Sequence, residues 1–155
     1  MLCNNLELVA DIVISSTQII RITHPVEVLN SVLFTNDCLC KIGYVSNPNC
    51  TFCSQLTETI SHILFSCSFS NSFGCEVNEK ILSKIKSCRG LSLTYCDIIV
   101  GSFEEEMDLF NYIVILGKSF LWTCRCRETL PSLSHFIRIL VIKYETEKHS
   151  SNQIK

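Results

Sequence analysis

Glycine and proline are scarce in this sequence. Its 155 residues include five glycines and three prolines, which disfavours a turn-rich β fold and favours helices. Charged residues make up 18 per cent of the chain and hydrophobic residues 47 per cent, a composition that argues against disorder. A chain of this length fits one domain with a core of its own. The expected fold class is therefore mostly α.

Several membrane and catalytic signals are also missing. The longest apolar run, from Phe110 to Trp122, is broken by Lys118, so no segment is expected to span a bilayer. The N-terminus has no basic flank before an apolar run, so no signal peptide is expected. Neither a Gly-rich phosphate loop nor the Tyr/Phe-x-Asp-Asp string of a polymerase palm occurs. We expect a protein of the nucleus or cytoplasm with no membrane partner and no small-molecule substrate.

Cysteine, by contrast, is abundant. The chain has eleven cysteines, and an odd number without an export signal favours reduced thiols and metal ligands over a disulfide framework. Cys50 and Cys53 form a C-x-x-C turn, and His62 and Cys67 follow closely. Three sulfurs and one imidazole suit a closed tetrahedral Zn²⁺ site. The alternative is four unrelated core residues, because buried cysteine is a common small hydrophobe; we favour zinc.

The residues between the two halves of this candidate site read as a short helix over 57–66. Thr57 is the expected N-cap, and apolar residues recur on one side of the segment. His62 lies on this predicted helix, and Cys67 follows its C-terminal end. The helix is thus expected to bring both residues to the same point as the C-x-x-C turn, as one zinc-stapled turn in a small helical domain.

The stretch around these residues resembles a known family. The run LFTNDCLCKIGYVSNPNCTFC, residues 33–53, is similar to the C-terminal zinc-binding region of reverse transcriptases from LINE-like (non-LTR) retrotransposons. That region has TN-x-x-L, a glycine, and P-x-C-x-(F/Y)-C at matching positions; Tyr44 and Asn47 depart from it, and neither is a ligand position. The following ETISHILFSC, residues 58–67, resembles the family's continuation. The resemblance extends more loosely to about residue 144, and a Phe-Trp pair of the family reads Phe73-Gly74 here.

The resemblance implies a domain without catalytic activity. Its Zn²⁺ would be held by Cys50, Cys53, His62 and Cys67, and it would contact nucleic acid or the polymerase domain during target-primed reverse transcription. Two alternatives stay open: a zinc-stabilised protein-interaction module, and a retrotransposon relic without a selected function.

Charge is distributed unevenly along the chain. Residues 1–110 hold six basic and twelve acidic residues, whereas residues 111–155 hold seven basic and three acidic ones. A basic C-terminal third can meet the phosphates of RNA or DNA, although a solvated helix face is the commoner meaning of such a bias. The candidate nucleic-acid-binding residues are Lys118, Arg125, Arg127, Arg138 and Lys143.

Other chemistry with these residue types is not favoured. A cytidine-deaminase site needs His-x-Glu and a proline directly before its first cysteine, and neither pattern occurs here. The spare imidazoles His24, His135 and His149 lie in no local nucleophile signature. The C-x-C pairs at 38/40 and 124/126 diverge on a helix, so we expect one packed and one more exposed thiol in each rather than a second metal site.

The predicted organisation has four parts. Residues 1–24 match no pattern, residues 25–90 form the zinc-binding region, residues 91–149 form a helical C-terminal region, and residues 150–155 fray. Helices are expected over 26–34, 38–42, 57–66, about 69–85, 105–126 and 131–148, and residues 95–100 fit a strand or a helical turn. The expected inward face of the last helix comprises Leu133, Ile137, Leu140, Val141 and Tyr144.

Overall fold

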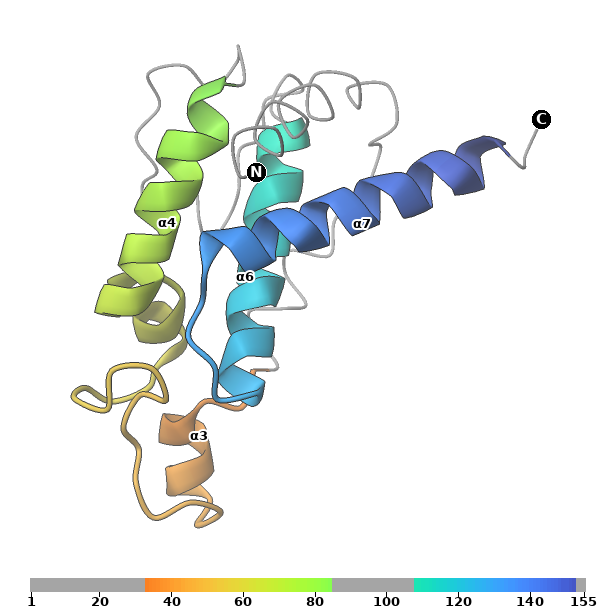
Figure 1. The fold of residues 1–155 in the computed structure, drawn as a ribbon. Helices are drawn as coiled ribbons and strands as arrows, with labels where there is room; N and C mark the ends of the chain where they lie inside the picture. Colours follow the sequence, from red (N-terminus) through yellow and green to blue (C-terminus); the bar gives the residue numbers. More distant parts are fainter. Residues whose placement is uncertain (1–32, 85–107, 153–155) are drawn as a thin grey trace.

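The computed structural model describes residues 33–84 and 108–152 of the chain (Figure 1). Its elements are, in chain order, α3 (Asn36–Lys41), the π-helix η2 (His62–Ser66), α4 (Ser68–Lys80), the 3₁₀ turn η3 (Leu82–Lys84), α6 (Asp108–Cys126) and α7 (Leu133–Asn152). The described ranges contain no strand, only an isolated antiparallel bridge between Asn49 and Thr57. The prediction of a mostly α fold is confirmed.

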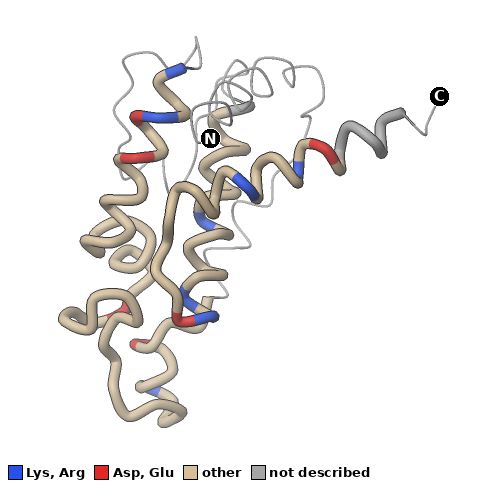
Figure 2. Tube along the Cα trace, viewed as in Figure 1, with Lys and Arg blue, Asp and Glu red and all other residues tan. Residues whose placement is uncertain are grey.

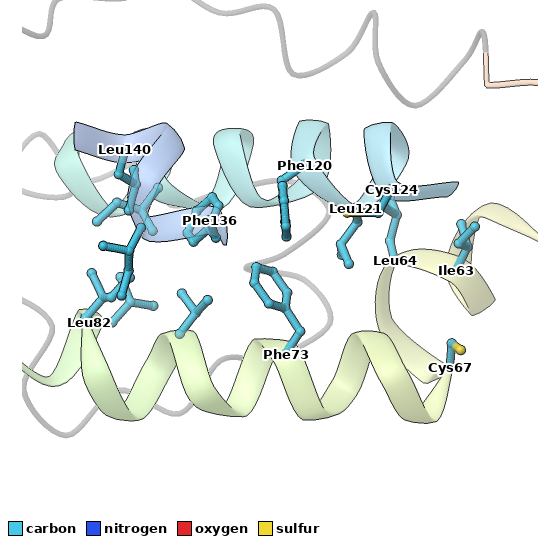
Figure 3. Packing of buried hydrophobic residues seen from close by; sticks show 14 of the residues in the cluster. Ile63, Leu64, Cys67, Phe73, Leu82, Phe120, Leu121, Cys124, Phe136 and Leu140 are labelled. Carbon is cyan, nitrogen blue, oxygen red and sulfur yellow. The ribbon is translucent and has the colours of Figure 1, made fainter. Parts of the chain in front are cut away.

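Three long helices form the body of the molecule. Helices α4 and α6 run side by side, and α7 begins beside α4 and crosses α6 (Figure 1). At their crossing, the rings of Phe73, Phe120 and Phe136 pack with centroids 5.3 to 5.4 Å apart (Figure 3). Tilted and edge-to-face pairs at this spacing are favourable beyond the area that they bury. One residue from each helix thus closes the centre of the core.

The cysteine-rich segment packs against one end of this body. Ile63, Leu64 and Cys67 are buried and belong to the same core cluster as α6 and α7 residues. Helix α3 lies near the C-terminal end of α6 (Figure 1). The segment 33–67 therefore shares one hydrophobic core with the C-terminal helices instead of forming a separate unit.

Most expected helices within the described residues occur with shifted ends. Helix α3 begins at Asn36, two residues before its expected start, and Gly43 follows it with φ +74°, a left-handed conformation that glycine adopts at helix C-termini. The helices expected at 69–85, 105–126 and 131–148 correspond to α4, α6 and α7. The segment 1–24, almost all of 26–34, and 95–100 lie outside the described residues. Within the described part, no helix is long and apolar enough to cross a membrane.

Candidate metal centre

Four donor side chains converge between the C-x-x-C turn and η2. The Sγ atoms of Cys50, Cys53 and Cys67 and a ring nitrogen of His62 all lie within 4.8 Å of one another. The Sγ atoms of Cys50 and Cys67 are 3.8 Å apart, and Cys53 Sγ lies 3.4 Å from His62 Nε2. A tetrahedral zinc with Zn–S near 2.3 Å and Zn–N near 2.0 Å places two sulfurs about 3.8 Å apart, and sulfur and nitrogen about 3.6 Å apart. The donor set and its spacing therefore fit Zn²⁺.

A tight reversal of the chain aims the first two thiols at this point. The Cys50 carbonyl accepts a hydrogen bond from Ser54 N–H at 2.8 Å, and Cys50 N–H donates to the Leu56 carbonyl at 2.8 Å. Ser54 adopts φ +57°, a conformation uncommon for residues other than glycine. The bridge between Asn49 and Thr57 closes the base of the loop. These bonds turn both sulfurs of the C-x-x-C toward the same side.

The π-helix η2 supplies His62, and Cys67, directly after its last residue, is the fourth donor. The N–H of Cys67 donates to the His62 carbonyl at 2.7 Å, a bond spanning five residues. In an α-helix of 3.6 residues per turn, positions five apart point to different sides; the wider π-turn reduces that divergence. His62 Nδ1 lies 3.2 Å from Ser66 Oγ, so Nε2 is left to face the sulfurs. A hydrogen bond on the other ring nitrogen is the usual way in which a metal-ligating histidine is oriented.

The predicted N-cap at Thr57 is wrong. Thr57 is held in the bridge with Asn49, and Glu58 and Thr59 after it are not helical. Instead, Thr59 Oγ1 accepts a hydrogen bond from the His62 N–H at 3.1 Å. The helical segment accordingly starts three residues later than expected, at residue 60.

The two thiols of the C-x-x-C turn differ strongly in acidity in the metal-free chain. Burial raises the pKa of Cys50 to about 12, against the smaller effect of hydrogen bonds from the backbone of Cys53 and Phe52. Burial also acts to raise the pKa of Cys53, but hydrogen bonds from the backbone N–H groups of Gln55 and Leu56 and from His62 outweigh it and lower this pKa to about 6. Cys53 is thus the thiolate that can meet an incoming cation first.

A buried carboxylate lies behind the C-x-x-C turn of residues 50–53, which we call the ligand turn. Glu58 is 0 % exposed and forms an ion pair with Arg125, whose Nη2 lies 2.9 Å from Oε1. Burial acts to raise the pKa of Glu58, but hydrogen bonds from Thr51 and Asn36 and the charge of Arg125 outweigh it, so the pKa is lowered. From the sequence alone, Glu58 is only one position of the family pattern and has no assigned role. One signal was available in the sequence. Glu58 lies close to apolar residues, and a carboxylate that is buried in such surroundings is almost always paired with a cation.

The five candidate nucleic-acid-binding residues fall into two groups. Arg127, Arg138 and Lys143 are exposed on the end of α6 and on α7, and Figure 2 shows basic residues along both helices. The structure gives the other two different surroundings. Lys118 is 6 % exposed, and burial lowers its pKa; Arg125 is paired with Glu58 and lies 4.9 Å from the centre of the Trp122 ring. We therefore remove Lys118 and Arg125 from the candidate set, because neither presents its charge to solvent.

Lys118 lines a pocket of about 160 Å³ between α4 and α6. The pocket is also lined by Gly74 and Gly117, and a Cβ atom built on either glycine would meet no atom within 4 Å. Gly74 stands where the resembled family often has tryptophan, whereas Phe73 beside it is buried in the core. Two of the positions that line this pocket therefore lack a side chain.

The described cysteines of the two C-x-C pairs behave as expected for packing residues and surface thiols. Cys124 is buried and Cys126 is exposed, whereas Cys38 is exposed and Cys40 is partly buried. Among the described residues, the four-donor group is the metal-binding cluster that the geometry identifies. His135 is exposed, with its ring against the edge of Phe120, while His24 and His149 lie outside the side chains that the structure describes.

Fold and donor set together define a small helical domain with a Cys₃His cluster suited to zinc. Residues 16–73 match the model of a family described as zinc-binding in reverse transcriptase, and this range contains all four donors. The match supports the reverse-transcriptase part of the resemblance over that segment, whereas the narrower likeness to LINE-like elements remains a prediction. No curated protein and no solved structure matches the chain.

Proposed function

We propose that the protein is a non-catalytic zinc-binding domain derived from the reverse transcriptase of a LINE-like retrotransposon. The observation that carries this proposal is the convergence of Cys50, Cys53, His62 and Cys67 at the spacing of a tetrahedral zinc. The segment matching the reverse-transcriptase family includes this whole donor set. The metal would act by folding, because it links the ligand turn to η2 in a segment with little regular structure of its own.

The number of donors supports a structural role for the metal. Catalytic zinc sites use three protein ligands and keep the fourth position for water or substrate. Here four side chains fill the tetrahedron, and two of them, Cys50 and Cys67, are at most 1 % exposed. A metal held in this way has no open position at which to activate water.

Contact with RNA or DNA is the proposed role of the basic C-terminal helices. Arg127, Arg138 and Lys143 are exposed, and the second half of α7 extends away from the other described helices (Figure 1). Lys143 lies on this projecting half, and all three exposed cations can reach phosphates without rearranging the core; binding of this kind weakens steeply with salt. By the resemblance, the template RNA, the target DNA or the adjoining polymerase domain would be the partner.

A protein-interaction module is the second candidate. It is favoured by large apolar side chains that are exposed in the segments flanking α3 and in the loop after the C-x-x-C turn, where they serve no core. These are Phe34, Ile42, Tyr44 and Leu56. Exposed apolar surface is a feature of protein-binding sites, and binding through it would change little with salt.

The metal is tested first. Purified, reduced protein is expected to contain about one zinc per chain, and Cys53→Ser and His62→Ala are expected to lose the metal together with helical circular dichroism. Cys75→Ser is the matched control, because Cys75 is an exposed thiol outside the cluster and its loss should leave the metal in place. A well-folded wild-type protein without zinc would contradict the proposal.

Nucleic-acid contact is tested by titrating labelled single-stranded RNA and duplex DNA at several salt concentrations. Replacing Arg127, Arg138 and Lys143 together by alanine should weaken binding and flatten its dependence on salt by about three charges. Lys84→Ala, an exposed lysine at the end of η3, is the control. Binding that is unchanged by the triple substitution would place the contact elsewhere, and a salt-insensitive protein partner would favour the second candidate.

A further inference from the structure

The carboxylate of Glu58 joins three segments that are far apart in the sequence. Its Oε1 accepts the N–H of Asn36, at the start of α3, at 2.9 Å. Its Oε2 accepts the N–H and the hydroxyl of Thr51, in the ligand turn, at 2.7 and 2.6 Å. From the last turn of α6, Arg125 Nε donates to Oε1 at 3.0 Å. Both oxygens of a fully buried carboxylate are thus engaged.

These bonds fix the backbone on both sides of the first ligand. Thr51 follows Cys50 directly, and its N–H and hydroxyl are both held by Glu58. On the other side, Asn36 Nδ2 donates to the carbonyl of Asn49 at 2.8 Å. The direction in which Cys50 presents its sulfur is therefore set by Glu58 and Asn36, although neither side chain is a donor to the metal.

Arg125 holds these two residues in place. Its Nη2 lies 2.9 Å from Glu58 Oε1 and donates to Asn36 Oδ1 at 2.8 Å. The second bond orients the Asn36 amide, so that its Nδ2 group faces Asn49. The guanidinium also balances a carboxylate that would otherwise be an unpaired buried charge. The planar fork of arginine makes both contacts at once, which the single ammonium of lysine cannot reproduce.

We propose that Arg125 is a positioning residue for the metal centre: through Glu58 and Asn36 it holds the turn that carries Cys50 and Cys53 in its metal-binding geometry. This inference rests on zinc binding at the four-donor cluster. Arg125 lies outside residues 16–73, the segment that matches the zinc-binding family. The metal affinity of this chain therefore depends on the end of α6, a part of the molecule that contributes no ligand.

The expected effect is a loss of metal affinity. Partners that orient a metal's ligands typically change the affinity about 10- to 100-fold when they are removed, and we expect a fall in this range for Arg125→Ala. Arg125→Lys keeps a positive charge near Glu58 but loses the contact with Asn36, so its affinity should lie between those of the wild type and the alanine variant. Arg127→Ala, two residues away and exposed, should retain wild-type affinity.

The experiment is a competition of each full-length variant against a chromophoric chelator for Zn²⁺, followed by absorption spectra with Co²⁺ at saturation. Loss of positioning should alter the ligand-field bands of bound Co²⁺ in the Arg125 variants, because those bands report the geometry of the donors. Phe136→Ala, which destabilises the core far from Glu58, should leave the Co²⁺ spectrum unchanged. This comparison separates positioning from general destabilisation.

The outcomes distinguish this inference from the proposed function. If the wild type binds no zinc, the metal centre itself fails. If the wild type binds zinc and Arg125→Ala and Arg125→Lys both bind it equally well, or both give the wild-type Co²⁺ spectrum, only the role of Arg125 is overturned. Should Arg125→Ala not fold, Arg125→Lys decides alone, and an unchanged affinity and spectrum in that variant contradict the inference.

Discussion

The thiols of Cys50 and Cys53 differ in both burial and hydrogen bonding, and this difference has a measurable consequence. At pH 7 in the metal-free chain, Cys53 is mostly thiolate because its pKa is about 6, whereas Cys50 keeps its proton because its pKa is about 12. Since the thiolate is the reactive form, iodoacetamide should modify Cys53 well before Cys50. Below pH 6 the labelling of Cys53 should slow about tenfold per pH unit as its sulfur becomes protonated.

Peptide mass spectrometry after brief labelling measures both residues in the same molecule, so Cys50 is the internal control. Saturating zinc should protect both thiols. Equal labelling rates at pH 7, or a rate at Cys53 that does not fall in acid, would contradict the assigned difference. The same protonation argument predicts that zinc affinity rises with pH, because binding displaces a proton from Cys50.

The sequence alone indicates the candidate metal ligands, but it does not indicate which residues hold those ligands in place. The four candidate ligands could be chosen from local spacing, since C-x-x-C and the following His and Cys lie within eighteen residues. The contact of Glu58 with Arg125 joins positions 67 apart, and no local periodicity reports such a pair. Charge bias and the family resemblance accordingly make Arg125 a candidate for phosphate contact, whereas the structure places its guanidinium against a buried carboxylate.

At the level of elements, helix existence was predictable and helix geometry was not. Amphipathic spacing identified α4, α6 and α7 because each helix buries one face. The π-turn of η2 was not foreseen, because its five-residue hydrogen bond depends on how Cys67 is drawn back beneath His62. The displaced N-cap has a similar cause, since the N–H of Glu58, directly after Thr57, donates to the distant Pro48 carbonyl, and the helix begins only after Thr59.

Replacement by alanine should have opposite effects at two glycines, Gly74 inside α4 and Gly43 just after α3. Gly74 lies inside α4, and a Cβ there would meet no atom within 4 Å, so Gly74→Ala should stabilise the protein by about 0.5–1 kcal/mol. Gly43 also has free space around it but adopts φ +74°, so Gly43→Ala should destabilise by about 1 kcal/mol or more. Urea unfolding at fixed zinc concentration measures both variants against the wild type.

The paired design separates helix propensity from packing. Both substitutions add the same methyl group into open space, and they differ in backbone conformation. A loss of stability in Gly74→Ala would mean that the pocket beside α4 cannot accept a methyl group. Equal effects at the two positions would contradict the backbone explanation.

On the scale of the whole molecule, the zinc-binding segment and the C-terminal helices depend on each other. The core cluster contains residues of the ligand turn and η2 together with residues of α6 and α7. The ion pair between Glu58 and Arg125 ties the same two parts together at the surface of that core. The expectation of one domain agrees with this shared core, and the division into a zinc-binding region, 25–90, and a helical region, 91–149, stays a prediction about the sequence.

Phe136 is the residue through which this dependence can be tested. It is 0 % exposed, yet it is missing from the inward face that the sequence predicts for the last helix, which includes its neighbour Ile137. Apolar periodicity predicts a single buried stripe along a helix. Helix α7 buries the adjacent residues Phe136 and Ile137 because it packs against both α4 and α6. The Phe136 ring lies 5.3 Å from that of Phe73 and 5.4 Å from that of Phe120, so it is the contribution of α7 to the central cluster.

Phe136→Ala should therefore destabilise the whole molecule by about 3–5 kcal/mol, the usual cost of emptying a buried phenylalanine site. Phe69→Ala is the matched control: Phe69 lies on α4 but is 39 % exposed, so its loss should cost about 1 kcal/mol or less. Urea unfolding with zinc at saturation compares the two variants. Because folding and metal binding are coupled, Phe136→Ala should also lower zinc affinity although the ring touches no ligand. Unchanged affinity in a clearly destabilised Phe136 variant would show instead that the zinc-binding segment folds independently of α7.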